Sequence, residues 1–222
     1  SGTPTLNSGT ISFYNLTIDP SSLTISTSTD AITVTNTLNV ATGDTLSLIS
    51  GQTLTHSGAT LTLNGTISGD GLYVYQSATA FPTTGTISVD LRMYATSNDQ
   101  SMGARTYGGD VEIYNSSSST ARTVTLGTGA SQTLTFSGNL TLTVASSRSV
   151  TATADTNDPT INVSGSVTIG SNTIYTAASS TGSPLTIGND FANSGTFTHS
   201  NGTIAFNNSA NTSTLTYSAA TT

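Results

Sequence analysis

Short runs in which aliphatic residues alternate with threonine, serine or asparagine recur along the whole chain. The clearest run covers residues 31–71, where Thr-Leu pairs begin at Thr37, Thr45, Thr53 and Thr60 and a glycine or aspartate closes each step. Alternation with a period of two places the aliphatic side chains on one face of an extended strand and the hydroxyls on the other. The pattern therefore predicts strands of four or five residues joined by tight turns.

Strands this short bury too little apolar surface to be stable alone, so a series of similar strands predicts a stacked, repetitive architecture. Three pairs of segments resemble each other: residues 13–15 and 113–115, residues 52–55 and 132–135, and residues 32–40 and 161–169. The first two pairs have offsets that differ by 20 residues (113 − 13 = 100 and 132 − 52 = 80). We interpret this difference as one whole turn of a coil.

The predicted fold class is all-β, a parallel β-solenoid with about 20 residues per coil and about eleven coils. It forms a single elongated domain over residues 1–222. A β-sandwich whose N-terminal strand is donated to a neighbour is the alternative, because turns every 8–12 residues also suit a sandwich.

Residues 91–110 break the alternation and are predicted to be an irregular excursion from the regular body. They contain both methionines, two of the four arginines and two tyrosines. Because loops often carry function, Arg92, Tyr94, Arg105 and Tyr107 are candidate ligand-binding residues.

Composition narrows the classes of partner. One Glu and no Lys leave no helical pattern, so no α-helix is expected. The net charge of −7 and the wide spacing of the four arginines argue against a nucleic-acid partner, because phosphate binding needs a clustered cationic surface. No run approaches the roughly 18 apolar residues of a membrane span.

The absence of Cys and Lys excludes disulfide and isopeptide links, so copies of the chain would have to associate non-covalently. A start at Ser1 without a signal peptide suggests a piece of an exported precursor.

The runs IGNDFANSGTFTHSNGTIAF (residues 187–206) and SFYNLTI (residues 12–18) resemble the Thr/Ser-rich repeats of very large bacterial surface and secreted proteins. Those repeats are taken to be parallel β-solenoids of the filamentous-haemagglutinin type. In them the first motif precedes the second, whereas here the order is reversed. The resemblance implies that the C-terminal end of one copy is followed by the N-terminal end of the next.

Neither end of the chain shows the polar repeat or helix that caps soluble solenoids. We therefore expect the structural subunit of an extracellular, cell-surface filament, polymerising head to tail as a homopolymer. The candidate subunit-interface residues are Ile11, Phe13, Leu16, Ile18, Ile204, Phe206, Leu215 and Tyr217. The alternative function is an adhesin or carbohydrate-binding spacer of a giant surface protein, with glycans or cell surfaces as partners.

Catalysis is not expected, and neither is a cofactor or a metal. His56 and His199 lie far apart in sequence, and the best group of acids is Asp90, Asp99 and Asp110. The segment from Asp155 through Asn157 to Asp158 could offer calcium ligands, although turn chemistry before Pro159 explains the same residues.

Other side chains suggest surface functions. Tyr73 and Tyr75 share one face and could stack on a sugar ring. The preferred interpretation is that they pack across strands or form a contact between subunits. The candidate glycosylation sites are Asn15, Asn64, Asn115, Asn139, Asn162, Asn201, Asn207 and Asn211, a number close to chance expectation. Thr-x-Thr pairs beginning at Thr33, Thr53, Thr60, Thr133 and Thr141 raise ice binding as a further alternative.

Overall fold

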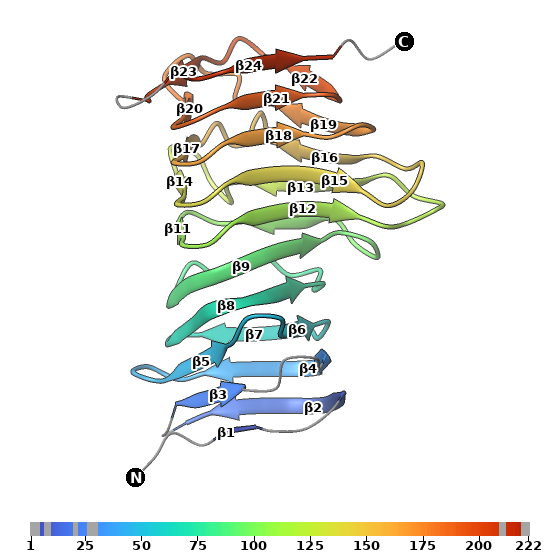
Figure 1. Ribbon diagram of the computed structural model, residues 1–222, viewed down its shortest axis with the longest axis vertical. Coiled ribbons are helices and arrows are strands. Elements are labelled where there is room, and N and C mark those ends of the chain that lie inside the picture. The colour runs from blue at the N-terminus through green and yellow to red at the C-terminus, as the bar shows by residue number, and fades with distance from the viewer. Residues whose placement is uncertain (1–4, 7–9, 20–21, 26–30, 209–211, 219–222) are drawn as a thin grey trace.

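The computed structural model is an all-β parallel solenoid of about 9 turns with ~23 residues per coil, and it describes residues 5–6, 10–19, 22–25, 31–208 and 212–218 (Figure 1). All 22 strand pairings that it contains are parallel. This confirms the predicted solenoid over the sandwich. In the described residues no helix is long and apolar enough to cross a membrane.

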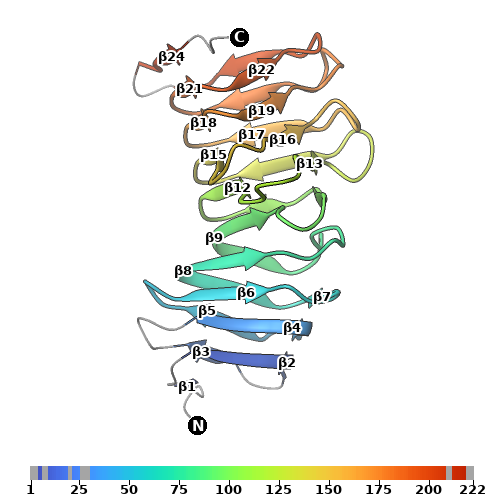
Figure 2. The ribbon, with the colours of Figure 1, turned by 90° about the vertical axis from the view of Figure 1, so that its right-hand side faces the viewer.

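The strands stack into three faces that run along the solenoid axis (Figures 1 and 2). Face 1 contains β2 (Ile11–Ile18), β4 (Ala31–Val40), β6 (Thr53–His56), β8 (Thr66–Tyr75), β9 (Thr86–Tyr94), β12 (Val111–Asn115), β15 (Leu140–Val144), β18 (Val167–Ile169), β21 (Phe191–Asn193) and β24 (Leu215–Tyr217). Face 2 contains β1 (Thr5–Leu6), β3 (Leu23–Ile25), β5 (Thr45–Leu48), the first halves of β8 and β9, β11 (Thr106–Tyr107), β14 (Thr133–Phe136), β17 (Thr160–Val163), β20 (Leu185–Ile187) and β23 (Ile204–Phe206).

Face 3 is a separate five-stranded sheet in the C-terminal half. It contains β10 (Gln100–Met102), β13 (Arg122–Leu126), β16 (Val150–Thr153), β19 (Thr173–Thr176) and β22 (Thr196–Thr198). In the N-terminal half, β7 (Thr60–Leu63) pairs with the second half of β4, which in turn pairs with the second half of β2.

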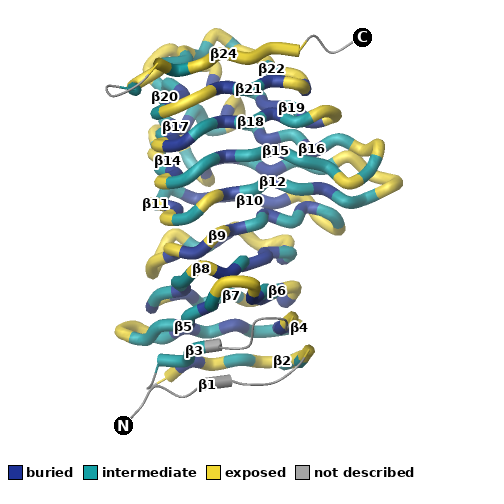
Figure 3. The backbone as a smooth tube through the Cα atoms, in the orientation of Figure 1, coloured by how far each residue is buried: buried dark blue, intermediate teal, exposed yellow. Residues whose placement is uncertain are grey.

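Residues in register on face 1 form two columns that point into the core. The first column is Ile11, Ile32, Leu54, Tyr73, Leu91, Val111, Leu140, Val167, Phe191 and Leu215. The second is Phe13, Val34, His56, Tyr75, Met93, Ile113, Leu142, Ile169, Asn193 and Tyr217. Except in the end coils, these side chains are buried, and they belong to one continuous core along the rod (Figure 3).

Coil length varies because the corners between faces absorb extra residues. The paired residues Tyr73 and Leu91 are 18 positions apart, whereas Val111 and Leu140 are 29 apart. The strands keep their register while loops of different length project from the rod. Nine turns at ~4.8 Å per turn give a body roughly 45 Å long.

Gly69 allows β8 to turn from face 2 to face 1. Its φ is +112°, and a Cβ there would lie 2.0 Å from the carbonyl oxygen of Leu48. The pairing of β8 with β9 shifts register between Ser68 and Leu72, at this same point. Only glycine fits both the backbone conformation and the close approach of the neighbouring coil.

Two sequence predictions differ from the structure. The estimate of about eleven coils is too high, because the average coil is longer than 20 residues. Residues 91–110 are not an excursion: they contain the end of β9, β10 and β11, and their inward side chains Leu91, Met93, Met102 and Tyr107 are buried. This segment completes one coil of the regular body.

Candidate subunit interface

The C-terminal end of the rod exposes apolar side chains on edge strands. Among the described strands, β24 pairs only with β21, β23 only with β20 and β22 only with β19. Leu215 is 66% exposed, Tyr217 is 67% exposed and Phe206 is 45% exposed. In Figure 3, β24 is the last labelled strand at this end of the rod and is coloured as exposed.

An open cavity of about 420 Å³ lies at this end of the core. Its walls are Phe191, Asn193, Gly195, Thr196, Phe197, Ile204, Leu215 and Tyr217. Among the described residues, the inner columns therefore end in a largely apolar hollow. Three of the predicted interface residues, Ile204, Leu215 and Tyr217, line it together.

The N-terminal end has a matching edge in β2, which pairs only with β4 among the described strands. Ile11, Phe13 and Leu16 are half-buried and pack on the core from this end. Tyr14 is 70% exposed. Ile18 is only 3% exposed, so its own coil already buries this predicted interface residue.

Charges are nearly absent from both ends. Residues 191–222 contain no Asp, Glu, Lys or Arg, and residues 1–29 contain only Asp19. Charged side chains on an edge strand are a common protection against strand pairing between molecules. Residues 30–190 therefore carry −6 of the formal charge of −7, and the edge strands β2 and β24 contain no charged residue.

The four candidate ligand-binding residues do not form one site. Arg92 lies on the outside of face 1, with its Nε 2.6 Å from Glu112 and its guanidinium 4.8 Å from the Tyr114 ring centroid. Tyr94 stacks on Tyr114 with centroids 5.1 Å apart. These contacts link β9 to β12.

Arg105 and Tyr107 lie on a different face and hold the corner near Phe81. Arg105 lies over the rings of Phe81 and Tyr107 and donates hydrogen bonds to the carbonyl oxygens of Pro82, Thr84 and Gly85. Tyr107 is buried, and its hydroxyl donates to the carbonyl oxygen of Gly103 at 3.0 Å. Burial raises the pKa of Tyr107 well above its usual value.

The acids of the candidate catalytic group act as structural acceptors. Asp90 accepts the N–H of Asp110, Asp110 accepts the N–H of Asn139, and Asp99 accepts the N–H of Thr123. No group of three or more Asp, Glu or His side chains suited to a metal ion occurs in the residues described.

The residues considered for calcium are engaged in loop contacts. Asp158 accepts hydrogen bonds from the N–H groups of Ser179 and Ser180 and from the Ser179 hydroxyl. Asn157 donates to the carbonyl oxygen of Gly127. These contacts favour the turn interpretation over a metal site.

His56, Tyr73 and Tyr75 all lie inside the core and are fully buried. A role for the tyrosine pair in stacking on sugars at the surface is therefore wrong. Burial lowers the pKa of His56 below its usual value, so the neutral imidazole is the form the core accommodates. His199 is exposed on the coil that follows β22, far from His56.

The candidate glycosylation sites differ in accessibility. Asn115 is fully buried and donates to the carbonyl oxygens of Thr120 and Ser149, so a glycan there is incompatible with the fold. Asn139 is half-buried and bonds to Asp110. Asn15, Asn64, Asn201 and Asn207 are exposed, Asn162 is half-buried, and Asn211 lies outside the described residues.

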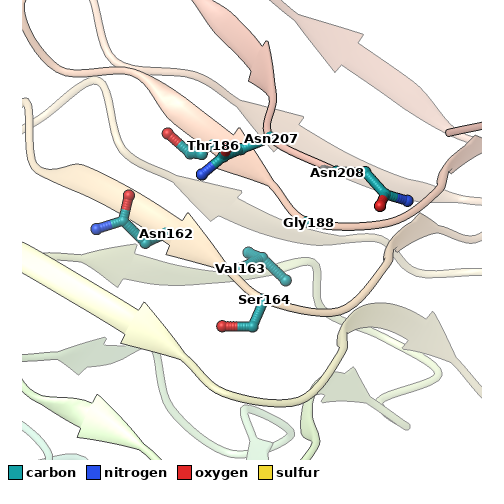
Figure 4. Close-up of a pocket in the computed structure, with 7 residues that line it drawn as sticks. All are labelled: Asn162, Val163, Ser164, Thr186, Gly188, Asn207 and Asn208. Carbon is teal, nitrogen blue, oxygen red and sulfur yellow. The ribbon is translucent and has the colours of Figure 1, made fainter. Parts of the chain in front are cut away.

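A shallow polar cleft of about 320 Å³ lies on the side of the rod (Figure 4). Its lining residues are Asn162, Val163, Ser164, Thr186, Gly188, Asn207 and Asn208. They come from three successive coils of face 2. The lining contains amide and hydroxyl groups but no aromatic ring and no charge.

The Thr-x-Thr pairs do not form one surface. The pair beginning at Thr33 lies on face 1, the pair beginning at Thr60 is on β7, and the pair beginning at Thr133 is on face 2. These pairs therefore do not provide the single ranked array that ice binding requires.

No protein-family model matches this chain, and searches of curated proteins and of solved structures found no match either. The resemblance to filamentous-haemagglutinin-like repeats therefore depends on the two end motifs and residues 31–71, and it remains a prediction.

Proposed function

We propose that this chain is the structural subunit of an extracellular filament at a cell surface, and that copies join non-covalently through their end coils. The distribution of exposed apolar side chains supports this most directly. In the described residues, the large hydrophobic side chains that are exposed are Tyr14, Phe206, Leu215 and Tyr217, and all four lie in the end coils. Exposed apolar groups gathered in one region favour a contact surface.

The mechanism is addition of strands across the junction. The edge strands β2 and β24 each offer a row of backbone donors and acceptors, which another parallel strand can pair with. The contributing residues are Ile11, Phe13 and Leu16 of one copy and Ile204, Phe206, Leu215 and Tyr217 of the other. Because the two surfaces differ, the contact leaves a free surface at each end and generates an open filament.

The alternative function, an adhesin or carbohydrate-binding spacer, has less support, because residues 91–110 contain strands of a regular coil. Arg92, Tyr94, Arg105 and Tyr107 are divided between two faces and are engaged in contacts within the rod. A spacer would remain a monomer of fixed length and would bind glycans in that form.

The test measures particle length against protein concentration by negative-stain electron microscopy and analytical ultracentrifugation. A filament subunit gives rods that lengthen with concentration and shorten on dilution. Rods of a single body length, roughly 45 Å, at every concentration would contradict the proposal.

A variant with a charge in the C-terminal edge strand β24 tests the junction most directly. Leu215→Asp places a carboxylate in the inner column, where the next copy would bury it, and Leu215 is exposed enough in one copy for the change to leave the fold intact. Thr216→Asp is the matched control, because the next residue of β24 points to the outside of the same face. We expect Leu215→Asp to raise the concentration needed for growth about 100-fold, and Thr216→Asp to change it much less. Equal effects of the two variants would contradict a junction built on the inner columns.

A further inference from the structure

A ladder of side chains runs along one edge of face 1 and links successive coils. Its members are Asp90, Asp110, Asn139, Ser166, Asp190 and Thr214, each one residue before a member of the first inner column. In all five steps, the side-chain oxygen of one member accepts a hydrogen bond from the backbone N–H of the next, at 2.7 to 3.3 Å. Aspartate, asparagine and serine all serve as the acceptor.

A second hydrogen bond runs in the opposite direction in each step. The backbone N–H of the residue after each ladder member donates to the carbonyl oxygen of the next member, as when Phe191 donates to Thr214 at 3.0 Å. The same bond joins Leu91 to Asp110, Val111 to Asn139, Leu140 to Ser166 and Val167 to Asp190. Each rung is therefore a reciprocal pair with one side-chain acceptor and one main-chain acceptor.

The last rung ends at the edge of the molecule. Thr214 has a hydroxyl in the acceptor position, and the following residue, Leu215, begins the edge strand β24. At the other end of the rod, Thr10 occupies the corresponding place, one residue before Ile11 of the first inner column. Both threonines are exposed.

We propose that the ladder continues into a second copy of this chain, so that Thr214 of one copy lies directly below Thr10 of the next. This inference rests on the proposed filament and adds the register of its junction. The N–H of Thr10 donates to the Thr214 hydroxyl, and the N–H of Leu215 donates to the carbonyl oxygen of Thr10. The junction then repeats, for a sixth time, the rung that links the coils within the molecule.

The inner columns agree with this register. It places Ile11 on Leu215 and Phe13 on Tyr217, so an aliphatic residue follows an aliphatic one and an aromatic residue follows an aromatic one. The pair Ile11 and Phe13 enters the apolar cavity that Leu215 and Tyr217 line. A slip of one residue would turn every inward side chain outward, and a slip of two would leave either Ile11 or Leu215, depending on its direction, without an apolar partner in the column.

Substitution of Thr214 tests the side-chain acceptor. Thr214→Val keeps the shape but removes the acceptor, and we expect it to raise the critical concentration for growth about fivefold, the effect of one hydrogen bond. Thr214→Asp restores the acceptor that Asp90, Asp110 and Asp190 provide in the lower rungs. It should assemble at least as well as the parent chain, because a carboxylate is the stronger acceptor. Equal effects of both variants would overturn the ladder at the junction.

Cross-linking tests the register itself, and because the chain contains no cysteine, every disulfide joins two introduced residues. The proposed register pairs the exposed residues Ser12 and Thr216, whose Cα atoms would lie about 4.8 Å apart, within the range that a disulfide spans. Ser12→Cys and Thr216→Cys chains are mixed, assembled and oxidised. The control mixes Ser12→Cys with Ser218→Cys, a pair about 8 Å apart in this register and too distant to bridge.

The outcomes separate the register from the function. Dimers from the Ser12 and Thr216 pair, with few from the control pair, support the register. Rods that grow but cross-link mainly through Ser12 and Ser218 overturn the register and leave the filament standing. Chains that neither grow nor cross-link overturn both.

Discussion

Replacing Asn115 by aspartate should open one region of the rod while leaving the rest closed. The Asn115 side chain is fully buried where the chain leaves β12 for an exposed loop. Its amide nitrogen donates to the carbonyl oxygens of Thr120 and Ser149, both at 3.0 Å, and its oxygen accepts the N–H of Ser117 at 2.8 Å. Asn115→Asp keeps the shape of the side chain but replaces both donors by an ionised oxygen.

The magnitude follows from these contacts. The carbonyl oxygens of the exposed Thr120 and the half-buried Ser149 each lose one donor, although Ser149 keeps the N–H of Arg122, so this loss costs about 1 kcal/mol per group. The introduced carboxylate is also buried next to those carbonyl oxygens, and none of its three contacts is a cation. We therefore expect the stability of this region to fall by about 3–5 kcal/mol in total. The loss should decrease at acid pH, because burial raises the pKa of the introduced carboxyl and its protonated form can donate one hydrogen bond.

Amide hydrogen exchange is the suitable assay, because a solenoid opens locally and a single global free energy of unfolding does not describe it. At pH 7 the amides of β12, β13, β15 and β16 should exchange about 150-fold to 5000-fold faster in the variant, the factor that about 3–5 kcal/mol corresponds to. The amides of β5 and β6 in the same molecule should not change. Asn64→Asp, at an exposed asparagine, is the control and should match the parent chain. Unchanged protection of β12 in Asn115→Asp would refute this reasoning.

Three further predictions concern the core. His56 has a lowered pKa in the fold because of burial; the unfolded chain therefore binds a proton first as the pH falls, so stability should decrease below about pH 6.5. His56→Leu should remove that part of the pH dependence of urea unfolding, and an unchanged pH dependence would contradict the assignment. Gly69→Ala should destabilise the adjacent coils by about 3 kcal/mol, because a Cβ there meets the Leu48 carbonyl at a φ of +112°; normal hydrogen-exchange protection of β8 would count against it. Phe136→Ala removes a fully buried ring stacked on Tyr107 at 5.2 Å and should cost about 3–5 kcal/mol in chemical denaturation, whereas a loss below 1 kcal/mol would contradict close packing at that site.

Alternation in the sequence predicted the direction of side chains but not the face on which each strand lies. Ile32 and Val34 point inward and Thr33 outward, as expected. However, residues 52–55 and 132–135, which resemble each other, belong to β6 on face 1 and β14 on face 2. Their offset therefore does not measure whole coils. Every strand has the same inside-outside pattern, and only the corners determine which face comes next.

The prediction of an irregular excursion at residues 91–110 is wrong because a polar residue occupies a core position there. Gln100 is buried, and its amide donates to the carbonyl oxygens of Tyr75 and Ser77 in the coil below. Those partners are more than 20 residues away in sequence, so no local pattern could reveal that the glutamine is satisfied inside. The strands β10 and β11 in this segment are also only three and two residues long, which is too short for alternation to be recognised.

The strand at residues 215–217 was predictable from its alternation, whereas the role of its residues in a subunit interface stays a prediction. The ladder was not predictable, because its members vary from Asp90 to Asn139 to Ser166 and are spaced unevenly. A polar residue directly before an inward apolar residue is the only signal, and it becomes meaningful once the register is known.

The winding of one chain around a narrow core determines how the rod would respond to a pulling force. Tension along the axis acts on the short hydrogen-bonded rungs of one terminal coil at a time, since inner coils are held from both sides. Each coil that peels away releases ~23 residues, or about 75 Å of extended chain. A single body would therefore lengthen in discrete steps, one coil at a time.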